Sequence, residues 1–207
     1  MAAVSSRGKF ITLEGVDGAG KSTHIPWIAE RLRVGGREVV VTREPGGTPL
    51  AEKLRERVLT EAMDPVAETR LMFEARADHV RAVIAPALAR AAWVVCDRFT
   101  DSTLAYQGAG KGVDRSLIEE LAGKTHPGLR PDLTLVFDAT YAVSSQRLGA
   151  SGRQPDRFET EGRGFFDRVR EAYRELAEKE PDRVRLIDGT KSADEVKKDI
   201  EKVLSSI

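Results

Sequence analysis

The sequence predicts an α/β protein: a doubly wound, five-stranded parallel sheet with helices on both faces. Five short apolar runs lack the polar alternation of a half-exposed strand, which is typical of a parallel sheet covered on both sides. Segments with helical periodicity separate these runs. Polar clusters follow the predicted strands or lie on the next helix, and ligands of such sheets bind at the carboxyl ends of the strands.

The predicted strands cover residues 9–14, 38–42, 93–97, 133–138 and 183–188. The predicted helices are a run after the first strand that ends at 34–36, then 48–62, 68–92, 116–125, a helix that opens at 142–148, 165–180 and 192–207. Pro86 should kink or divide the longest helix, and Pro26 should strain the first turns of the first one. Ser192, with Glu195 three residues on, predicts a capped start for the last helix.

The length of 207 residues predicts one domain, 1–207, and the Gly- and Arg-rich stretch 149–164 predicts a surface excursion within it. A net charge of zero argues against a nucleic-acid-binding protein. The sequence shows neither a membrane span nor a signal peptide. Cys96, the single cysteine, is expected in the core, so no disulfide forms within the chain. We therefore expect a cytoplasmic protein with neither nucleic-acid nor membrane partners.

The segment "GVDGAGKS", residues 15–22, lies between a predicted strand and a predicted helix, as a phosphate-binding loop requires. Glycines let the backbone wrap a phosphate, and the amides of the helix N-terminus attract its charge. Lys21 would contact the β and γ phosphates, and the Ser22 hydroxyl would bind Mg²⁺. A chance glycine-rich turn is the alternative. The predicted ATP-binding residues are Gly15, Val16, Asp17, Gly18, Ala19, Gly20, Lys21, Ser22 and Thr23.

A nucleotide site alone leaves the reaction open. A GTPase switch would normally read guanine through an Asn-Lys-x-Asp segment, and this chain contains no asparagine. A motor or AAA-type ATPase would need a longer chain. The interpretation that fits is a small kinase, which moves a phosphoryl group onto a small acceptor.

Two clusters predict where the acceptor binds. In "TREPGGTPLAEKLRE", residues 42–56, Arg43 is placed after a strand to meet a phosphate, and Pro-Gly-Gly lets the backbone pass close to a ligand. In "LMFEARADHV", residues 71–80, Phe73 and Arg76 share a helix face and could stack on a base and hydrogen-bond it. The alternative is that Phe73 belongs to the core and Arg76 is a surface charge.

A third cluster, "CDRFTDSTLAYQG", covers residues 96–108 and directly follows the third predicted strand. Asp97 holds the position of a strand-end acid near Mg²⁺, and Arg98 could bridge donor and acceptor phosphates. A structural ion pair is the alternative for both. Tyr106 and Gln107 offer a flat wall and an amide.

Taken together, the chain resembles the thymidylate kinase family of bacteria. The matching segments, in order, are "FITLEGVDGAGKST", "TREPGGT", "FEAR", "DRFTDSTLAYQG", "RPDLTLVFD", "GRQPDRFE" and "LIDGT". The resemblance implies a P-loop NTPase fold with a mobile lid, at about residues 147–164, and typically a homodimer. It implies transfer of the γ-phosphoryl group of ATP to dTMP, with Mg²⁺.

The resemblance also implies roles for individual residues. Asp17 would contact the 3′-hydroxyl of dTMP, and Arg98 with Arg43 would hold its phosphate. Tyr106 would lie near the 2′ carbon and disfavour ribose. The base pocket would consist of Phe73, Arg76, Thr103 and Gln107. Many members carry the aromatic ring four residues before the arginine, where this chain has Met72.

Some members carry a catalytic arginine inside the loop, where this chain has Gly18; the others supply arginines from the lid. This chain resembles the second type, with Arg147, Arg153 and Arg157 as the candidates. The acceptor phosphate is already ionised, so Mg²⁺, Lys21, Arg98 and the lid arginines would act by position and charge rather than by removing a proton.

Two rival functions stay open at this point. Another nucleotide kinase of the same fold could prefer dUMP or dGMP through small changes in the pocket. A nucleotide-dependent switch or binding module, from a different class, would bind ATP without turnover. A kinase consumes ATP quickly only when an acceptor is present, which separates the two.

Overall fold

Five parallel strands form the central sheet: β1 Phe10–Gly15, β2 Val39–Arg43, β3 Trp93–Asp97, β4 Leu133–Asp138 and β5 Val184–Asp188. They lie side by side in the order β2-β3-β1-β4-β5 in the computed structural model, which describes residues 7–152 and 154–207. This confirms the predicted five-stranded parallel sheet. The register sets Asp97 of β3 opposite both Leu13 of β1 and Arg43 of β2, so the polar residues that end these strands meet at one edge.

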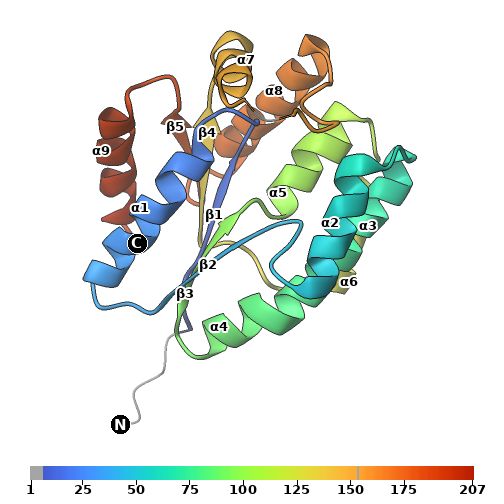
Figure 1. The fold of residues 1–207 in the computed structure, drawn as a ribbon. Coiled ribbons are helices and arrows are strands. Elements are labelled where there is room, and N and C mark those ends of the chain that lie inside the picture. Colours follow the sequence, from blue (N-terminus) through green and yellow to red (C-terminus); the bar gives the residue numbers. More distant parts are fainter. Residues whose placement is uncertain (1–6, 153) are drawn as a thin grey trace.

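Helices cover both faces of the sheet, as the sequence predicts. They are α1 Lys21–Val34, α2 Pro49–Thr60, α3 Pro65–His79, η1 Val80–Ile84, α4 Ala85–Ala89, α5 Thr100–Thr103, η2 Leu104–Gly110, α6 Arg115–Thr125, α7 Tyr141–Ala150, α8 Arg163–Lys179 and α9 Ala193–Leu204. Helices α1 and α9 lie together on one face, while α4, α5 and α8 pack against the other (Figure 1). In the described residues, no helix combines the length and the apolar character that crossing a bilayer requires.

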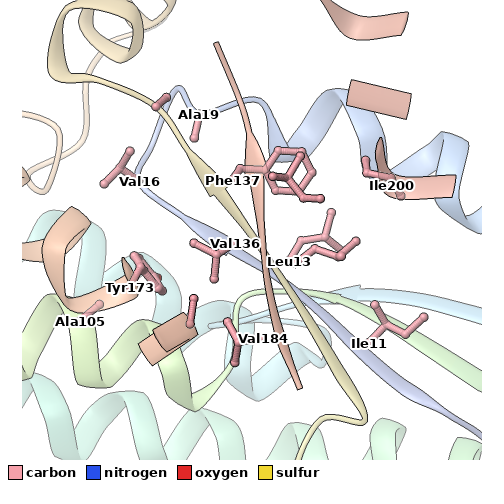
Figure 2. Packing of buried hydrophobic residues seen from close by; sticks show 14 of the residues in the cluster. Ile11, Leu13, Val16, Ala19, Ala105, Val136, Phe137, Tyr173, Val184 and Ile200 are labelled. Carbon is pink, nitrogen blue, oxygen red and sulfur yellow. The ribbon is translucent and has the colours of Figure 1, made fainter. Parts of the chain in front are cut away.

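The main core lies between the sheet and these two helix layers. Leu13 of β1 and Val136 of β4 are buried at its centre, with Tyr173 of α8 and Ile200 of α9 packed from the helices (Figure 2). The prediction that strands are buried on both faces is confirmed for β1 and β4 and is wrong for the edge strands β2 and β5. Val41 of β2, for example, is 43% exposed, because an edge strand has a neighbour on one side only.

Pro86 divides the predicted helix 68–92, as expected. Helix α3 ends at His79, and the π-helical turn η1 precedes the short α4 that contains Pro86. In η1 the N–H of Ala85 donates to the carbonyl of Val80, five residues back, and this wider turn accommodates the proline. Pro26 lies inside α1, which runs on as one helix.

The sequence analysis assigned no helix to residues 100–110, where the structure has α5 and η2. Thr, Asp, Ser and Gly in this stretch have low helix propensity, so local pattern alone does not predict it. Packing against α8 stabilises it instead. A Cβ on Gly110 would lie 2.4 Å from the ring of Phe165, so the glycine allows the close approach of the two helices.

Candidate active site

The glycine-rich loop connects the end of β1 to the start of α1, which confirms the strand–loop–helix context that the sequence predicts. Gly15 has a φ of 123°, and a Cβ there would lie 2.4 Å from the carbonyl oxygen of Phe137. Gly20 has a φ of 110° at the residue before the helix. Both positions therefore require glycine, and the loop they shape leaves its amides at the N-terminus of α1.

Lys21 lies at the first position of α1 and its side chain folds back over the loop. Its Nζ donates to the carbonyl oxygens of Gly15 at 2.9 Å and Val16 at 3.0 Å. Burial lowers the pKa of Lys21, while the carboxylates around it, Asp97 and Asp17 among them, act in the opposite direction. The ammonium is thus held in place at the loop before any nucleotide arrives.

A phosphate cavity opens over this loop, and we use that name for it below. Its lining is charged and polar, includes five cationic and five acidic side chains, and comprises Asp17, Gly18, Gly20, Lys21, Ser22, Thr23, Arg43, Glu44, Arg55, Asp97, Arg98, Arg147, Leu148, Ser151, Asp156 and Glu159. Its one lysine and four arginines can pair with the oxygens of a polyanion, and its five carboxylates partly balance their charge. Arg55 was not predicted from the sequence. It lies in α2, whereas Arg43 ends β2, and only the fold shows that both reach the same cavity.

Two oxygen donors in the phosphate cavity fit a magnesium ion. Ser22 supplies a hydroxyl, and Asp97 supplies a carboxylate whose Oδ1 is buried without a hydrogen-bond partner among the described residues. Mg²⁺ prefers oxygen ligands and usually takes only one or two from the protein. Within the described residues no group of three or more His, Cys, Asp or Glu side chains is arranged to hold a metal ion.

Arg98 connects the loop to the helix α5–η2. Its Nη2 donates to Asp17 Oδ1 at 2.7 Å and to the Tyr106 hydroxyl at 3.0 Å, and that hydroxyl donates to Asp17 Oδ2 at 2.9 Å. Burial alone would raise the pKa of Asp17, but the charges of Arg98 and Lys21 and the hydrogen bonds from Arg98 and Tyr106 together outweigh burial and hold that pKa well below its usual range. Arg98 also has a φ of 70°, a left-handed backbone that is rare for arginine and is typical of functional sites.

Glu14, fully buried at the end of β1, supports Arg98 from behind. Its carboxylate accepts from the Phe99 amide at 2.7 Å, the Ser102 hydroxyl at 2.5 Å and the Tyr173 hydroxyl at 2.9 Å. Ser102 in turn accepts from Arg98 Nη1 at 3.1 Å. Burial, with a smaller contribution from the charge of Asp101, raises the pKa of Glu14 to about 7.

A second cavity, the acceptor pocket, adjoins the phosphate cavity through Asp17, Arg98 and Glu44. Its volume is about 460 Å³ when the open space at its mouth is included. Its wall consists of Asp17, Glu44, Pro45, Arg55, Val58, Leu59, Met72, Arg98, Ser102, Tyr106, Gln107, Asp156 and Phe158.

Met72 lines the acceptor pocket, whereas Phe73 is 2% exposed and packs in a core cluster with Val113 and Ile118. The difference of one residue rotates a side chain by about 100° around a helix. Phe73 still adjoins the site, because the Arg76 guanidinium lies 4.6 Å from its ring centroid. The structure therefore brings Phe73 to Arg76 and not to the wall of the pocket.

Arg76 is held by a buried chain of polar groups. Its Nε donates to Glu44 Oε2 at 2.6 Å and its Nη2 to the Thr103 hydroxyl at 3.1 Å. Glu44 Oε1 lies 2.9 Å from His79 Nδ1, and His79 Nε2 lies 2.6 Å from the Thr42 hydroxyl. Arg76 Nη1 is buried and has no hydrogen-bond partner in residues 7–152 and 154–207. Arg76 is thus not a surface charge.

Gln107 is held by Glu68, which lies in the first turn of α3 and is fully buried. Gln107 Nε2 donates to Glu68 Oε1 at 2.7 Å, and Lys111 Nζ donates to Oε2 at 2.9 Å. Gln107 Oε1 is buried and unpartnered within the part of the chain that the structure describes. Sequence reasoning missed Glu44, Glu68 and His79, since each acts through contacts more than thirty residues away along the chain.

The predicted lid arginines lie in different places. Arg147 on α7 donates through Nη1 to the loop carbonyls of Gly18 at 3.4 Å and Ala19 at 3.3 Å, at the same end of the molecule as the end of β1 (Figure 1). Arg157 donates instead to Glu68 and to the carbonyl of Val58, beside the acceptor pocket. Arg153 lies outside the described residues.

The remaining predicted site residues lie in or near these two cavities. Arg43 lines the phosphate cavity and pairs with Glu52 at 3.0 Å, while Thr103 lies behind the acceptor pocket as a partner of Arg76. Val16 and Ala19 lie within the loop but are largely buried in the core.

Comparison with known proteins identifies the family of the chain. Residues 13–200 match the family described as thymidylate kinase. A thymidylate kinase of Burkholderia ambifaria is 52% identical over 97% of this chain and 98% of its own, and one of Cupriavidus metallidurans is 52% identical over 97% and 100%. The crystal structure of a thymidylate kinase from Ehrlichia chaffeensis superposes with a TM-score of 0.78 at 34% identity, over 96% of this chain and 99% of that one. The chain therefore belongs to the thymidylate kinase family.

Proposed function

We propose that this chain transfers the γ-phosphoryl group of ATP to dTMP, which gives ADP and dTDP for nucleotide biosynthesis. Membership of the thymidylate kinase family supports the reaction. The observation that carries the choice of acceptor is a pair of buried atoms, Arg76 Nη1 and Gln107 Oε1, that lack partners among the described residues. The first can only donate a hydrogen bond and the second can only accept one.

Thymine carries the complementary groups side by side, because its O4 accepts and its N3–H donates. Cytosine reverses both groups, so it would set donor against donor and acceptor against acceptor. A site built to hydrogen-bond one pattern rejects the other strongly, since its buried polar groups would stay unpaired. We propose that Met72 contacts the ring of the base, and that Phe73 acts indirectly by supporting the guanidinium of Arg76.

The phosphate of dTMP would bind at the junction of the two cavities. Arg98 and Arg43 supply its positive partners there, and Arg55 adds a third. We propose that Asp17, which Arg98 and Tyr106 hold at 2.7 and 2.9 Å, receives the 3′-hydroxyl of the deoxyribose. Tyr106 lines the pocket beside it and would disfavour a 2′-hydroxyl by contact.

ATP would place its phosphates on the loop, with the amides of residues 15–23 and Lys21 around them. Ser22 and Asp97 would hold Mg²⁺, which when bound neutralises phosphate charge and aligns the donor. Lys21, Arg98 and Arg147 then surround the space between donor and acceptor. Because the acceptor oxygen is already ionised, these cations promote transfer by position and charge, and no general base is required.

We propose that residues 147–164 act as the lid of a single domain. Of the two lid arginines that the structure describes, Arg147 already contacts the loop and is the better placed for the γ-phosphate. Arg157 would have to leave Glu68 and Val58 to reach it. Closure of such a segment excludes water and limits wasteful hydrolysis of ATP. Arg153 is a further candidate that the resemblance alone supports.

We also propose a cytoplasmic homodimer without nucleic-acid partners, on the resemblance and on the zero net charge. Light scattering after size-exclusion chromatography tests the dimer. Cell fractionation tests the location, and electrophoresis with labelled DNA and RNA tests the expected lack of nucleic-acid binding.

An ADP-release assay with Mg-ATP tests the function, with dTMP, dUMP, dCMP, dGMP and AMP supplied in turn. We expect strong stimulation by dTMP, weak or no stimulation by dCMP, and loss of both on Arg98→Ala. Equal stimulation by dCMP would contradict the assignment of Arg76 and Gln107. No stimulation by any acceptor would contradict the kinase.

A further inference from the structure

Glu68 is a buried carboxylate that no step of the proposed reaction uses. Its side chain is 0% exposed, and it accepts hydrogen bonds from three groups: Gln107, Lys111 and Arg157. These groups come from two separate parts of the chain: Gln107 and Lys111 lie in η2 and directly after it, and Arg157 lies in the lid. Burying a charge is costly unless it is paired, so each of the three contacts contributes to keeping Glu68 where it is.

The contact with Gln107 determines which way its amide points. A carboxylate has no hydrogen to donate, so the NH₂ group of Gln107 must face Glu68 Oε1, at 2.7 Å. The amide oxygen must then face the opposite way, and it is the atom that is buried and without a partner among the described residues. Gln107 lines the acceptor pocket. Glu68 therefore sets the pocket's hydrogen-bonding pattern at this position.

The contact with Arg157 joins the same carboxylate to the lid. Arg157 Nη2 donates to Glu68 Oε2, and the next lid residue, Phe158, lines the acceptor pocket. Lys111 Nζ, the third partner of Glu68, lies 4.5 Å from the ring centroid of Phe158, and the Arg157 guanidinium lies 4.8 Å from it. The lid segment that closes the pocket is thus anchored on the residue that orients the base-reading amide.

We propose that Glu68 is a positioning and specificity-determining residue that fixes the Gln107 amide with its oxygen toward the base and anchors the lid through Arg157. Recognition of the base and docking of the lid then depend on one carboxylate. This inference rests on the proposed function for the identity of the base, while the anchoring of the lid is independent of it.

The variant Glu68→Gln tests the first half, because a glutamine can donate as well as accept and so removes the restriction on the Gln107 amide. We expect kcat/KM for dTMP to fall by about 10- to 100-fold, the cost of one mispaired buried hydrogen bond. We expect kcat/KM for dCMP to fall less or to rise, because a reversed amide suits its N3. The dTMP-to-dCMP ratio should drop at least tenfold, with the KM for ATP unchanged.

The matched control is Glu119→Gln, which neutralises an exposed partner of Arg115 on α6. It should leave the dTMP-to-dCMP ratio as in the wild type. A purely structural role for Glu68 would lower the melting temperature and leave the ratio within about twofold of the wild-type value, and that result would overturn the proposal.

Hydrogen exchange of the lid peptide 154–162 tests the second half and requires no turnover. We expect Glu68→Gln and Arg157→Met each to speed exchange there by about tenfold, and the double variant to be no faster than either single one. Arg157 is part-exposed, so its variant should fold even where Glu68→Gln does not. Unchanged exchange in Arg157→Met, or additive effects in the double variant, would overturn the anchoring. Inactive wild-type enzyme would instead count against the proposed function alone.

Discussion

The phosphate cavity and the acceptor pocket are neighbours built on different principles. Most of the phosphate cavity comes from the ends of β1, β2 and β3 and the first turn of α1, and it gathers one lysine and four arginines. The acceptor pocket has fewer charged side chains at its wall, and buried carboxylates hold its polar groups in place: Glu44, which is part of the wall, holds Arg76, and Glu68 holds Gln107.

The two cavities differ because a phosphate group and a base require different kinds of binding site. A phosphate carries a spread charge that several arrangements of cations and amides attract. A base is distinguished from its analogues by the direction of two hydrogen bonds, so the groups that read it must be fixed. Buried partners such as Glu44 and Glu68 hold these groups in place. Recognition of the base in the acceptor pocket therefore depends on contacts that also stabilise the fold.

The largest expected effect is on the base side, with Arg76→Met. It would leave Glu44 buried with His79 as its remaining side-chain partner among the described residues, so we expect a loss of about 3–5 kcal/mol in the free energy of unfolding. The KM for dTMP should rise as well. Urea denaturation and steady-state kinetics check both. Arg31→Met, which breaks an exposed pair with Glu201, is the control; an equal loss there would remove the contrast between the two regions.

On the phosphate side, Lys21→Ala should lower kcat by about 10²- to 10³-fold, because a positioned cation acts on the transferring group. The free energy of unfolding should change little, since the bonds of Lys21 go to loop carbonyls rather than to a buried charge. Single-turnover kinetics and urea denaturation measure the two quantities. Lys191→Ala, an exposed lysine paired with Asp199, is the control. If Lys21→Ala destabilised the protein as much as Arg76→Met, the proposed difference between the two cavities would be contradicted.

Glu14 is joined through Ser102 to Arg98, which lines both cavities, and it should make the stability of the protein depend on pH. Its pKa in the folded protein is raised from the ordinary 4.5 to about 7 by burial and by Asp101, so the folded state binds the proton more tightly than the unfolded state. That contribution to stability is complete below about pH 4.5 and is lost as the pH rises through about 7.

The variant Glu14→Gln mimics the protonated form. Relative to the wild type, it should gain up to about 3 kcal/mol of unfolding free energy between pH 4.5 and pH 8. Urea denaturation at a series of pH values measures the difference. A difference that does not change with pH would show that Glu14 keeps an ordinary pKa.

The smallest expected effect lies outside both regions. The side chain of Ser192 accepts from the Glu195 amide, and Glu195 accepts from the Ser192 amide, so a capping box begins α9. Ser192→Ala should cost about 1 kcal/mol of stability and leave kcat and KM unchanged. Thermal unfolding and the ADP-release assay check this. Any loss of turnover would mean that α9 contributes to the site in a way the contacts do not indicate.

The contrast between the regions also explains what the sequence could predict. The loop at 15–22 is contiguous and its spacing carries the chemistry, so the strand, the loop, Lys21 and the capped α9 followed from local pattern. The same holds for Arg43, Asp97 and Arg98, which end adjacent strands whose register brings them together. Helix α5–η2 could not be predicted from local pattern, because its residues are poor helix formers and packing against α8 stabilises it.

The layer behind the base pocket was not predictable in the same way. Glu44 meets Arg76 across 32 residues, and Glu68 meets Gln107 across 39. An acidic residue near the start of a helix, such as Glu68, is ordinary and signals nothing by itself. The exchange of Met72 for Phe73 at the pocket wall has a similar origin, since helical periodicity does not say which of two adjacent side chains faces the ligand.

The central claim is that the buried amide oxygen of Gln107 receives the N3–H of the thymine ring. NMR of bound dTMP carrying ¹⁵N at N3 observes that proton directly. We expect a slowly exchanging imino signal in the wild-type complex and its loss in Gln107→Leu at saturating dTMP. An imino proton that exchanges as fast as in free dTMP, or one that persists unchanged in Gln107→Leu, would contradict it.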